Sequence, residues 1–83
     1  MKDEIVEHIV KNKMRLKSEI APLKRELDVV LKKEVPDFHA LIKEQYNQKV
    51  RGLIVRDISI NLGVDYETSM ICLEDVNLDE VLK

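Results

Sequence analysis

The chain has 83 residues, of which 45% are hydrophobic and 36% charged, and its formal net charge is −2. It contains two glycines, two prolines, two tyrosines, one phenylalanine and no tryptophan, a composition that favours helices over a β-sandwich or β-barrel. No apolar run is long enough to cross a bilayer, which excludes a membrane span. We expect one small domain over residues 1–83, of a size at which self-association often supplements the core.

The single cysteine and the first ten residues indicate the cellular compartment of the protein. Cys72 is the only cysteine, so no internal disulfide can form. The chain opens MKDEIVEHIV, with acidic residues where a signal peptide would carry basic ones before an apolar run. These features predict a soluble, cytoplasmic protein.

The segment from Lys2 to about Val35 carries apolar residues at alternating three- and four-residue spacings, interrupted at Lys13. As one continuous helix it would be about 50 Å long, whereas a compact chain of this size has a radius of gyration of about 12 Å. Either the helix breaks, or another chain covers its protruding apolar seam. Residues 1–35 are therefore predicted to form a long helical segment that serves in oligomerisation.

Pro22 is the expected place for a bend in this segment. In a helix interior it removes the hydrogen bond to the carbonyl of Ser18, at a cost of about 3 kcal/mol. The apolar register runs through the proline, and no glycine nearby signals a reversal. We expect a kinked but roughly continuous helix, or two consecutive helices bent between Ser18 and Pro22.

The apolar seam of this segment is the predicted homodimer interface. Charges beside it favour a parallel pair, because Glu19 of one chain would then meet Lys24 of the other. The alternative is that the seam packs on later helices of the same chain. The predicted oligomerisation residues are Ile9, Leu16, Ile20, Leu23 and Leu27.

Residues 37–83 are predicted to form a compact helical part. Pro36 ends the first segment, and Asp37 is the expected cap of a helix, DFHALIKEQYNQ, that ends near Gly52. Near the C-terminus, Asn77 is placed to cap a last short helical turn. That turn would close over the core with Leu78, Val81 and Leu82.

The stretch RDISINLGVDYETSMICL, from Arg56 to Leu73, carries the one motif-like pattern. Its apolar, small and turn residues fall at Ile58, Ser59, Leu62, Gly63, Val64, Thr68 and Leu73, and Asp65 is placed to cap a second helix. In this spacing it resembles the helix-turn-helix motif of DNA-binding proteins. The stretch departs from the motif at Ser69, where a buried Val or Ile is usual, and its second helix has no basic residue to read bases.

A β-hairpin over residues 53–73 is the alternative for this region, which would make the fold α+β. Ile58, Ile60, Leu62 and Val64 alternate with more polar residues, as in a half-buried strand. Against it, no Asn-Gly or Asp-Gly turn is present, and an isolated hairpin is marginally stable. The preferred fold is all-α, with a long kinked N-terminal helix followed by a small helical bundle.

Charge divides unevenly along the chain. Up to Arg56 there are 13 basic and 9 acidic residues, whereas Asp57 to Lys83 contain 1 basic and 7 acidic ones. DNA binding depends on phosphate neutralisation, so an acidic second helix disfavours a nucleic-acid partner. If DNA is bound, Lys49, Arg51 and Arg56 are the predicted contacts to its backbone.

No constellation for catalysis or cofactor binding is present in the sequence. His8 and His39 lack metal-ligand spacing, Cys72 has no CxxC partner, and no glycine-rich phosphate loop occurs. We therefore expect no enzymatic activity, no metal and no cofactor.

The sequence is compatible with two functions. The preferred one is a small helical interaction and regulatory module that self-associates and binds a protein partner with a basic surface. The alternative is a dimeric helix-turn-helix transcriptional regulator that binds DNA. The predicted partner-binding residues are Tyr66, Glu67, Met70, Ile71 and Glu74.

Overall fold

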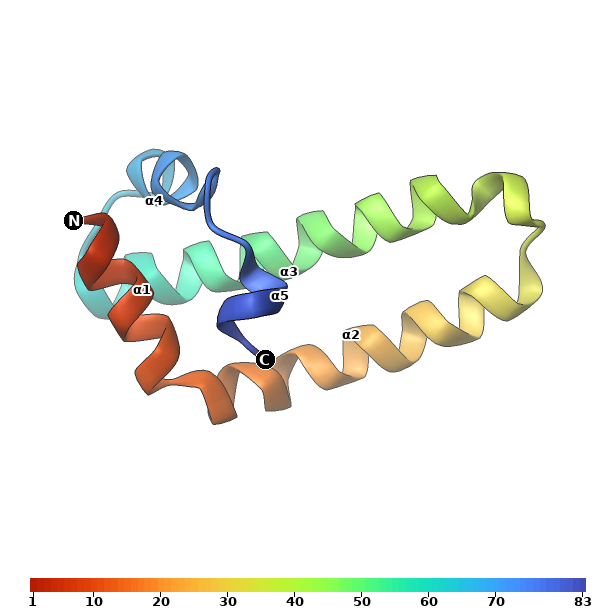
Figure 1. The fold of residues 1–83 in the computed structure, drawn as a ribbon, viewed down its shortest axis with the longest axis horizontal. Helices are drawn as coiled ribbons and strands as arrows, with labels where there is room; N and C mark the ends of the chain where they lie inside the picture. The colour runs from red at the N-terminus through yellow and green to blue at the C-terminus, as the bar shows by residue number, and fades with distance from the viewer.

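Two long helices form an antiparallel hairpin, and three shorter helices pack around its open end (Figure 1). The computed structural model describes residues 1–83, of which 84% are helical and none lie in a strand. The predicted all-α class is therefore confirmed. In chain order the elements are α1 (Lys2–Lys11), α2 (Lys13–Lys33), the 3₁₀ turn η1 (Pro36–Phe38), α3 (His39–Leu62), α4 (Tyr66–Leu73) and α5 (Leu78–Val81).

The alternative β-hairpin over residues 53–73 is wrong, because this stretch completes α3 and contains all of α4. The alternation that resembled a strand places Ile58 in the core but leaves Ile60 and Leu62 exposed. The preceding residues are already helical, and extending a helix avoids the cost of nucleating one. Helix propagation thus decides the conformation of a short apolar run that its period alone leaves ambiguous.

The N-terminal segment breaks at Asn12, ten residues before the predicted bend at Pro22. The side-chain Nδ2 of Asn12 donates to the carbonyl oxygen of His8 at 2.9 Å and so caps the end of α1. Asparagine competes with the helix in this way because its short amide reaches nearby backbone groups. The break coincides with the interruption of the apolar spacing at Lys13. It lets α1 fold back onto α3 and α4.

Pro22 lies in the interior of α2, which is one continuous helix there, so the alternative of two consecutive helices that meet between Ser18 and Pro22 is wrong. Both residues are exposed, and solvent can replace the hydrogen bond that the carbonyl of Ser18 loses. The flanking Ile20 and Leu27 stay buried on the opposite side of α2. Packing of that apolar side holds the helix together across the proline.

The third helix differs from its prediction at both ends. Val35 is extended before Pro36, as expected, but α3 begins at His39 after the 3₁₀ turn, and Asp37 does not cap it. Gly52 lies inside α3, which continues to Leu62. A glycine within a helix costs about 1 kcal/mol relative to alanine. Burial of Val50, Ile54, Val55 and Ile58 on the same helix outweighs that cost.

The turn between α3 and α4 has the predicted chemistry. Gly63 ends α3 in the left-handed conformation, with φ of 68°, which favours glycine. Asp65 caps α4 by accepting a hydrogen bond from the backbone N–H of Thr68 at 2.9 Å. Asn77 caps α5 in the same manner through the N–H of Glu80. These two predicted caps are confirmed.

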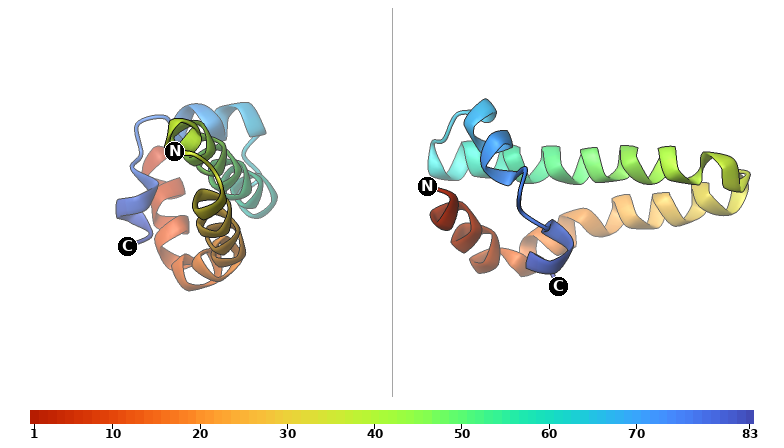
Figure 2. Two further views of the ribbon diagram at one scale, coloured as in Figure 1. Left: turned by 90° about the vertical axis from the view of Figure 1, so that its right-hand side faces the viewer. Right: turned by 45° about the horizontal axis from the view of Figure 1, so that its top comes forward.

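One core draws on both the N-terminal segment and the later helices. It combines Ile5 and Ile9 of α1 with Leu16 and Ile20 of α2, and it continues through α3 to Leu73 of α4. The residues predicted to close over the core are partly buried against it, namely Leu78, Val81 and Leu82. The far end of the hairpin extends beyond this core, and the molecule measures 41 × 23 × 20 Å (Figure 2).

The capping of α4 by Asp65 makes the stability of the fold depend on pH. Hydrogen bonds from Thr68 hold the pKa of Asp65 below its ordinary value. A lowered pKa in the folded state means that the ionised cap stabilises the fold above the ordinary aspartate pKa, and that this contribution is lost as pH falls. We therefore expect Asp65→Ala to lower the melting temperature by a few degrees at neutral pH.

The difference between wild type and Asp65→Ala should shrink in acid, where the carboxylate is protonated. Asp65→Asn is the matched control, because its amide oxygen can still accept the Thr68 hydrogen bond without titrating. Thermal melts followed by circular dichroism at neutral and acidic pH check this. Equal melting temperatures of wild type and Asp65→Ala at neutral pH would contradict the cap.

Candidate functional site

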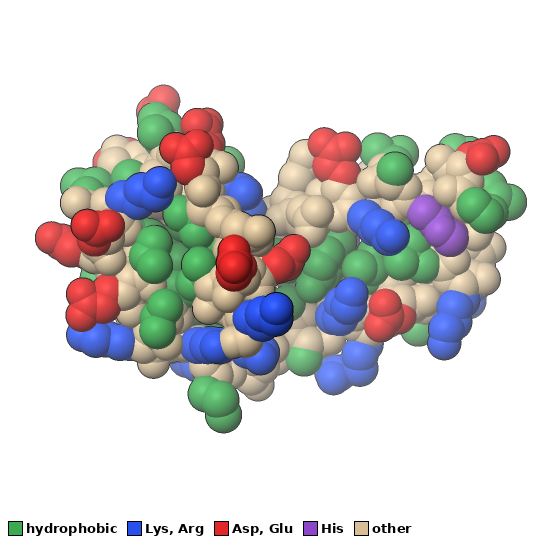
Figure 3. All heavy atoms as spheres, in the orientation of Figure 1, with side chains coloured by type: hydrophobic (Ala, Val, Ile, Leu, Met, Phe, Trp, Pro, Cys, Tyr) green, Lys and Arg blue, Asp and Glu red, His purple; other side chains and the backbone are tan.

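The outward side of α4 presents an apolar side chain among carboxylates. Ile71 is 59% exposed, and helical spacing places Glu67 and Glu74 next to it, while the exposed Asp75 follows in the turn that leaves the helix. The opposite side of α4 buries Ser69 and Leu73 in the core, which fixes the direction in which Ile71 points. In Figure 3, hydrophobic and acidic side chains gather over α4 at the upper left. We call Glu67, Ile71, Glu74 and Asp75 the α4 patch.

The five predicted partner-binding residues do not lie on one surface. Glu67, Ile71 and Glu74 belong to the α4 patch, whereas Met70 is half-buried and packs against the core. Tyr66 is 56% exposed but lines a hollow on α3, together with Arg56 and Ile60. The α4 patch therefore contains three of the five predicted partner-binding residues, together with Asp75, which was not among them.

A buried serine supports the position of α4. Ser69 occupies the place where the helix-turn-helix resemblance leads one to expect Val or Ile, and it is fully buried. Its hydroxyl donates to the carbonyl oxygen of Asp65 at 3.0 Å, which satisfies the polar atom inside the core. The side-chain oxygen of Ser59, in contrast, is buried without a hydrogen-bond partner.

Arg51 binds the C-terminal end of α4. Its Nη1 donates to the carbonyl oxygen of Leu73 at 2.8 Å, where the helix leaves carbonyls without intrahelical partners. Arg51 thus has a structural contact that the sequence did not predict. Lys49 and Arg56, the other two predicted DNA-backbone residues, are exposed on α3.

A hydrogen-bond network joins α1, α2 and α3 through Asp57. The Nε2 of His8 lies 2.8 Å from one carboxylate oxygen of Asp57, and Arg15 donates to the other oxygen at 2.8 Å. Asn61 also donates to Asp57, at 3.0 Å. The side chains of His8 and Asp57 are only 13% and 9% exposed. Because the two residues are 49 positions apart, helical spacing gives no signal for this contact.

The same network fixes the tautomer of His8. The amide nitrogen of Asn12 lies 3.3 Å from Nδ1, and since that nitrogen can only donate, Nδ1 accepts. The proton of a neutral ring is then on Nε2, which donates to Asp57. Both ring nitrogens are engaged within the fold, so neither is open to a substrate. The hydrogen bond to Asp57 also raises the pKa of Arg15, which stays charged.

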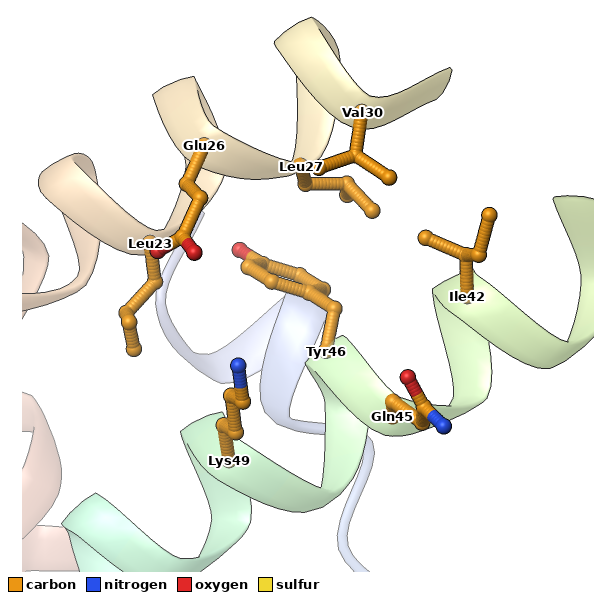
Figure 4. A pocket seen from close by; sticks show the side chains of 8 residues that line it. All are labelled: Leu23, Glu26, Leu27, Val30, Ile42, Gln45, Tyr46 and Lys49. Carbon is orange, nitrogen blue, oxygen red and sulfur yellow. The ribbon is translucent and has the colours of Figure 1, made fainter. Parts of the chain in front are cut away.

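A groove runs between α2 and α3 on the face away from α5. It consists of a cavity of about 110 Å³ near the hairpin turn and a wider hollow toward α4, and the two share Leu23 and Lys49. Figure 4 shows the cavity, with Glu26 on the α2 side, Lys49 on the α3 side and Tyr46 between the helices. We call this feature the α2–α3 groove. It extends from Val30 and Ile42 to Ile60 and Tyr66.

Tyr46 separates the α2–α3 groove from the opposite face of the hairpin. It lines both the groove and a second hollow that includes Asp79 and Leu82. Burial, with additional contributions from Asp79 and Asp28, raises the pKa of its phenol, which therefore stays neutral. The ammonium of Lys24 lies 5.7 Å from the centre of the ring.

The predicted oligomerisation seam lies inside the fold. Ile9 and Leu16 are fully buried, Ile20 and Leu27 nearly so, and Leu23 is partly buried against the core. Their neighbours are the chain's own helices, because the break at Asn12 turns α1 back over α3. The single overhanging helix that motivated the prediction is not formed.

No metal-binding arrangement of three or more His, Cys, Asp or Glu side chains occurs in the structure. Cys72 is partly buried and packs against the core. None of the helices combines the length and apolarity that crossing a membrane would require. In comparisons with protein-family models, curated proteins and solved structures, no match to this chain was found.

The Asp57 network should contribute measurably to stability. Asp57→Ala leaves the buried Nε2–H of His8 without an acceptor, and we expect it to lower the free energy of unfolding by about 1–3 kcal/mol. Urea denaturation measures the change. The matched control is Glu7→Ala, which removes the exposed Glu7 to Lys11 ion pair and should cost less than about 0.5 kcal/mol. Equal costs for the two variants would show that the network stabilises nothing.

Proposed function

We propose that this chain is a non-enzymatic interaction and regulatory module that binds a protein partner through the α4 patch and also self-associates. The observation that carries the partner proposal is Ile71, which is largely exposed and surrounded by carboxylates on a helix whose other side is fixed in the core. An apolar anchor within a polar rim is a common arrangement in protein interfaces.

The charge of the α4 patch supports a basic partner surface. Glu67, Glu74 and Asp75 are all exposed, and the one ion pair among them joins Asp75 to Lys2, whose Nζ lies 3.9 Å away in a largely solvated pair. Such a pair contributes little and is easily exchanged. A partner that places Lys or Arg around an apolar pocket would complement the α4 patch in shape and charge, and steering by charge would speed the encounter.

Duplex DNA is the second candidate partner. The glycine turn and aspartate cap between α3 and α4 favour it, as do the exposed Lys49 and Arg56 on α3. The outward side of α4 argues against DNA binding, because its carboxylates would face the phosphates of a major groove. Protein binding is therefore the stronger proposal.

Substitution of Ile71 tests the partner proposal. Ile71→Lys should leave the free energy of unfolding within about 0.5 kcal/mol of wild type, because the side chain is on the surface. It should abolish partner binding by placing a like charge against a basic surface. Affinity capture from the source cells, with captured proteins identified by mass spectrometry, compares the variant with wild type.

Two controls make this experiment specific. Met14→Lys alters an apolar residue that is 86% exposed on α2, away from the α4 patch, and should keep the partner. Met70→Lys places a charge against the core and should lower stability by about 1–3 kcal/mol. Capture of the same proteins by wild type and Ile71→Lys would contradict the proposal. Binding of wild type to random duplex DNA that weakens steeply with salt would favour the DNA candidate.

A further inference from the structure

The α2–α3 groove has two unlike rims. Glu19 and Glu26 of α2 line one side, seven residues apart and therefore on one stripe of the helix. Lys49 and Arg56 of α3 line the other side at the same spacing, and Asp57, which also lines the hollow, is already paired with His8 and Arg15. Glu26 and Lys49 line the same cavity, whereas Glu19 and Arg56 line the adjoining hollow, so the two acidic residues and the two basic residues stand at matching levels.

These charges are largely unused within the chain. Glu26, Lys49 and Arg56 take part in no ion pair, and Glu19 makes only an exposed contact with Arg15 at 3.5 Å. Between the rims the floor is apolar, with Leu23, Leu27 and Leu53. Gly52 lies on the α3 side, and a Cβ atom added there would meet no atom of another part of the chain within 4 Å. Another backbone can therefore approach α3 closely at this point.

From this pattern we propose that the α2–α3 groove is the self-association surface and that its occupant is the same groove of a second copy. If the two-fold axis runs along the groove, α2 of each copy packs on α3 of the other. Glu26 then meets Lys49 of the partner, and Glu19 meets Arg56 of the partner. With the axis perpendicular to the groove, α2 would pack on α2, and acidic residues would face acidic residues. The charges therefore select a parallel pair of hairpins.

The length of the groove allows an extended contact. It runs along the α2–α3 hairpin of a molecule 41 Å long, and a standard protein interface buries about 800 Å² on each partner. Four helices from two copies would then form a bundle over a shared apolar floor. This deepens the self-association within the proposed function and does not involve the α4 patch.

Charge reversal tests the pairing. The acid-reversed variant carries Glu19→Lys and Glu26→Lys, and the base-reversed variant carries Lys49→Glu and Arg56→Glu. Each alone should weaken dimerisation at least tenfold, because like charges would face one another across the interface. An equimolar mixture of the two should form a heterodimer about as stable as the wild-type homodimer. Sedimentation equilibrium over a range of concentrations measures all three.

Gly52→Gln provides a variant that should fold at least as well as wild type. Its side chain enters open space on a helix, so the melting temperature of the monomer should rise. In the dimer the same side chain would occupy the space of the partner's α2, and dimerisation should weaken at least tenfold. A Gly52→Gln variant that dimerises like wild type would overturn the proposal.

Orientation is tested by the distance between two labels. With Cys72→Ser and Asp37→Cys, a spin label on each copy reports the separation of the hairpin turns by pulsed electron resonance. A parallel pair gives a short distance, whereas an antiparallel pair gives one near the 41 Å length of the molecule. The long distance would overturn the parallel arrangement, and a wild-type protein that stays monomeric at hundreds of micromolar would overturn the dimer. Partner capture through Ile71 can succeed in either case, so the two proposals fail separately.

Discussion

The contact between His8 of α1 and Asp57 of α3 is the constraint on which the arrangement of this chain depends. It becomes possible because Asn12 ends α1 and lets the helix reverse. With α1 folded back, Ile5 and Ile9 are fully buried, which contributes about 1.5–3 kcal/mol for each side chain. The hydrogen bond also fixes the register of α1 against α3, because only one register of α1 brings His8 to the carboxylate of Asp57.

The reversal of α1 decides which surfaces remain available for binding. Ile9, Leu16 and Ile20, which would belong to an intermolecular seam on an extended helix, are covered by the chain's own core, whereas Leu23 and Leu27 line the α2–α3 groove. The surfaces left uncovered are the α4 patch, which is acidic around Ile71, and the α2–α3 groove, whose rims are of opposite charge. Under the function proposed above, a partner that differs from this chain binds the α4 patch and a second copy binds the α2–α3 groove. The two proposed contacts then use separate faces of the molecule.

Helix caps and turns that depend on only a few neighbouring residues could be predicted from the sequence. Gly63, Asp65 and Asn77 behave as their side chains dictate, since a cap needs only neighbouring backbone groups. The break at Asn12 was visible only as an interruption of apolar spacing, and Pro22 gave a stronger but misleading signal.

The sequence did not reveal the pairing of His8 with Asp57, nor the two rims of the α2–α3 groove, because both depend on how distant helices pack. The sequence predicted that Met70 or Ile71 would stay exposed beside acidic residues, whereas the structure was needed to show that Ile71 is the exposed one and that Tyr66 and Met70 are separate from it.

The tautomer of His8 tests the reversal of α1 most directly. Proton–nitrogen correlation spectra of the histidine side chains distinguish the two neutral tautomers from each other and from the charged ring. The structure predicts that His8 carries its proton on Nε2, with a through-space contact between its ring and the side chain of Asp57 on α3. A ring that exchanges between both tautomers, with no contact to α3, would contradict the account.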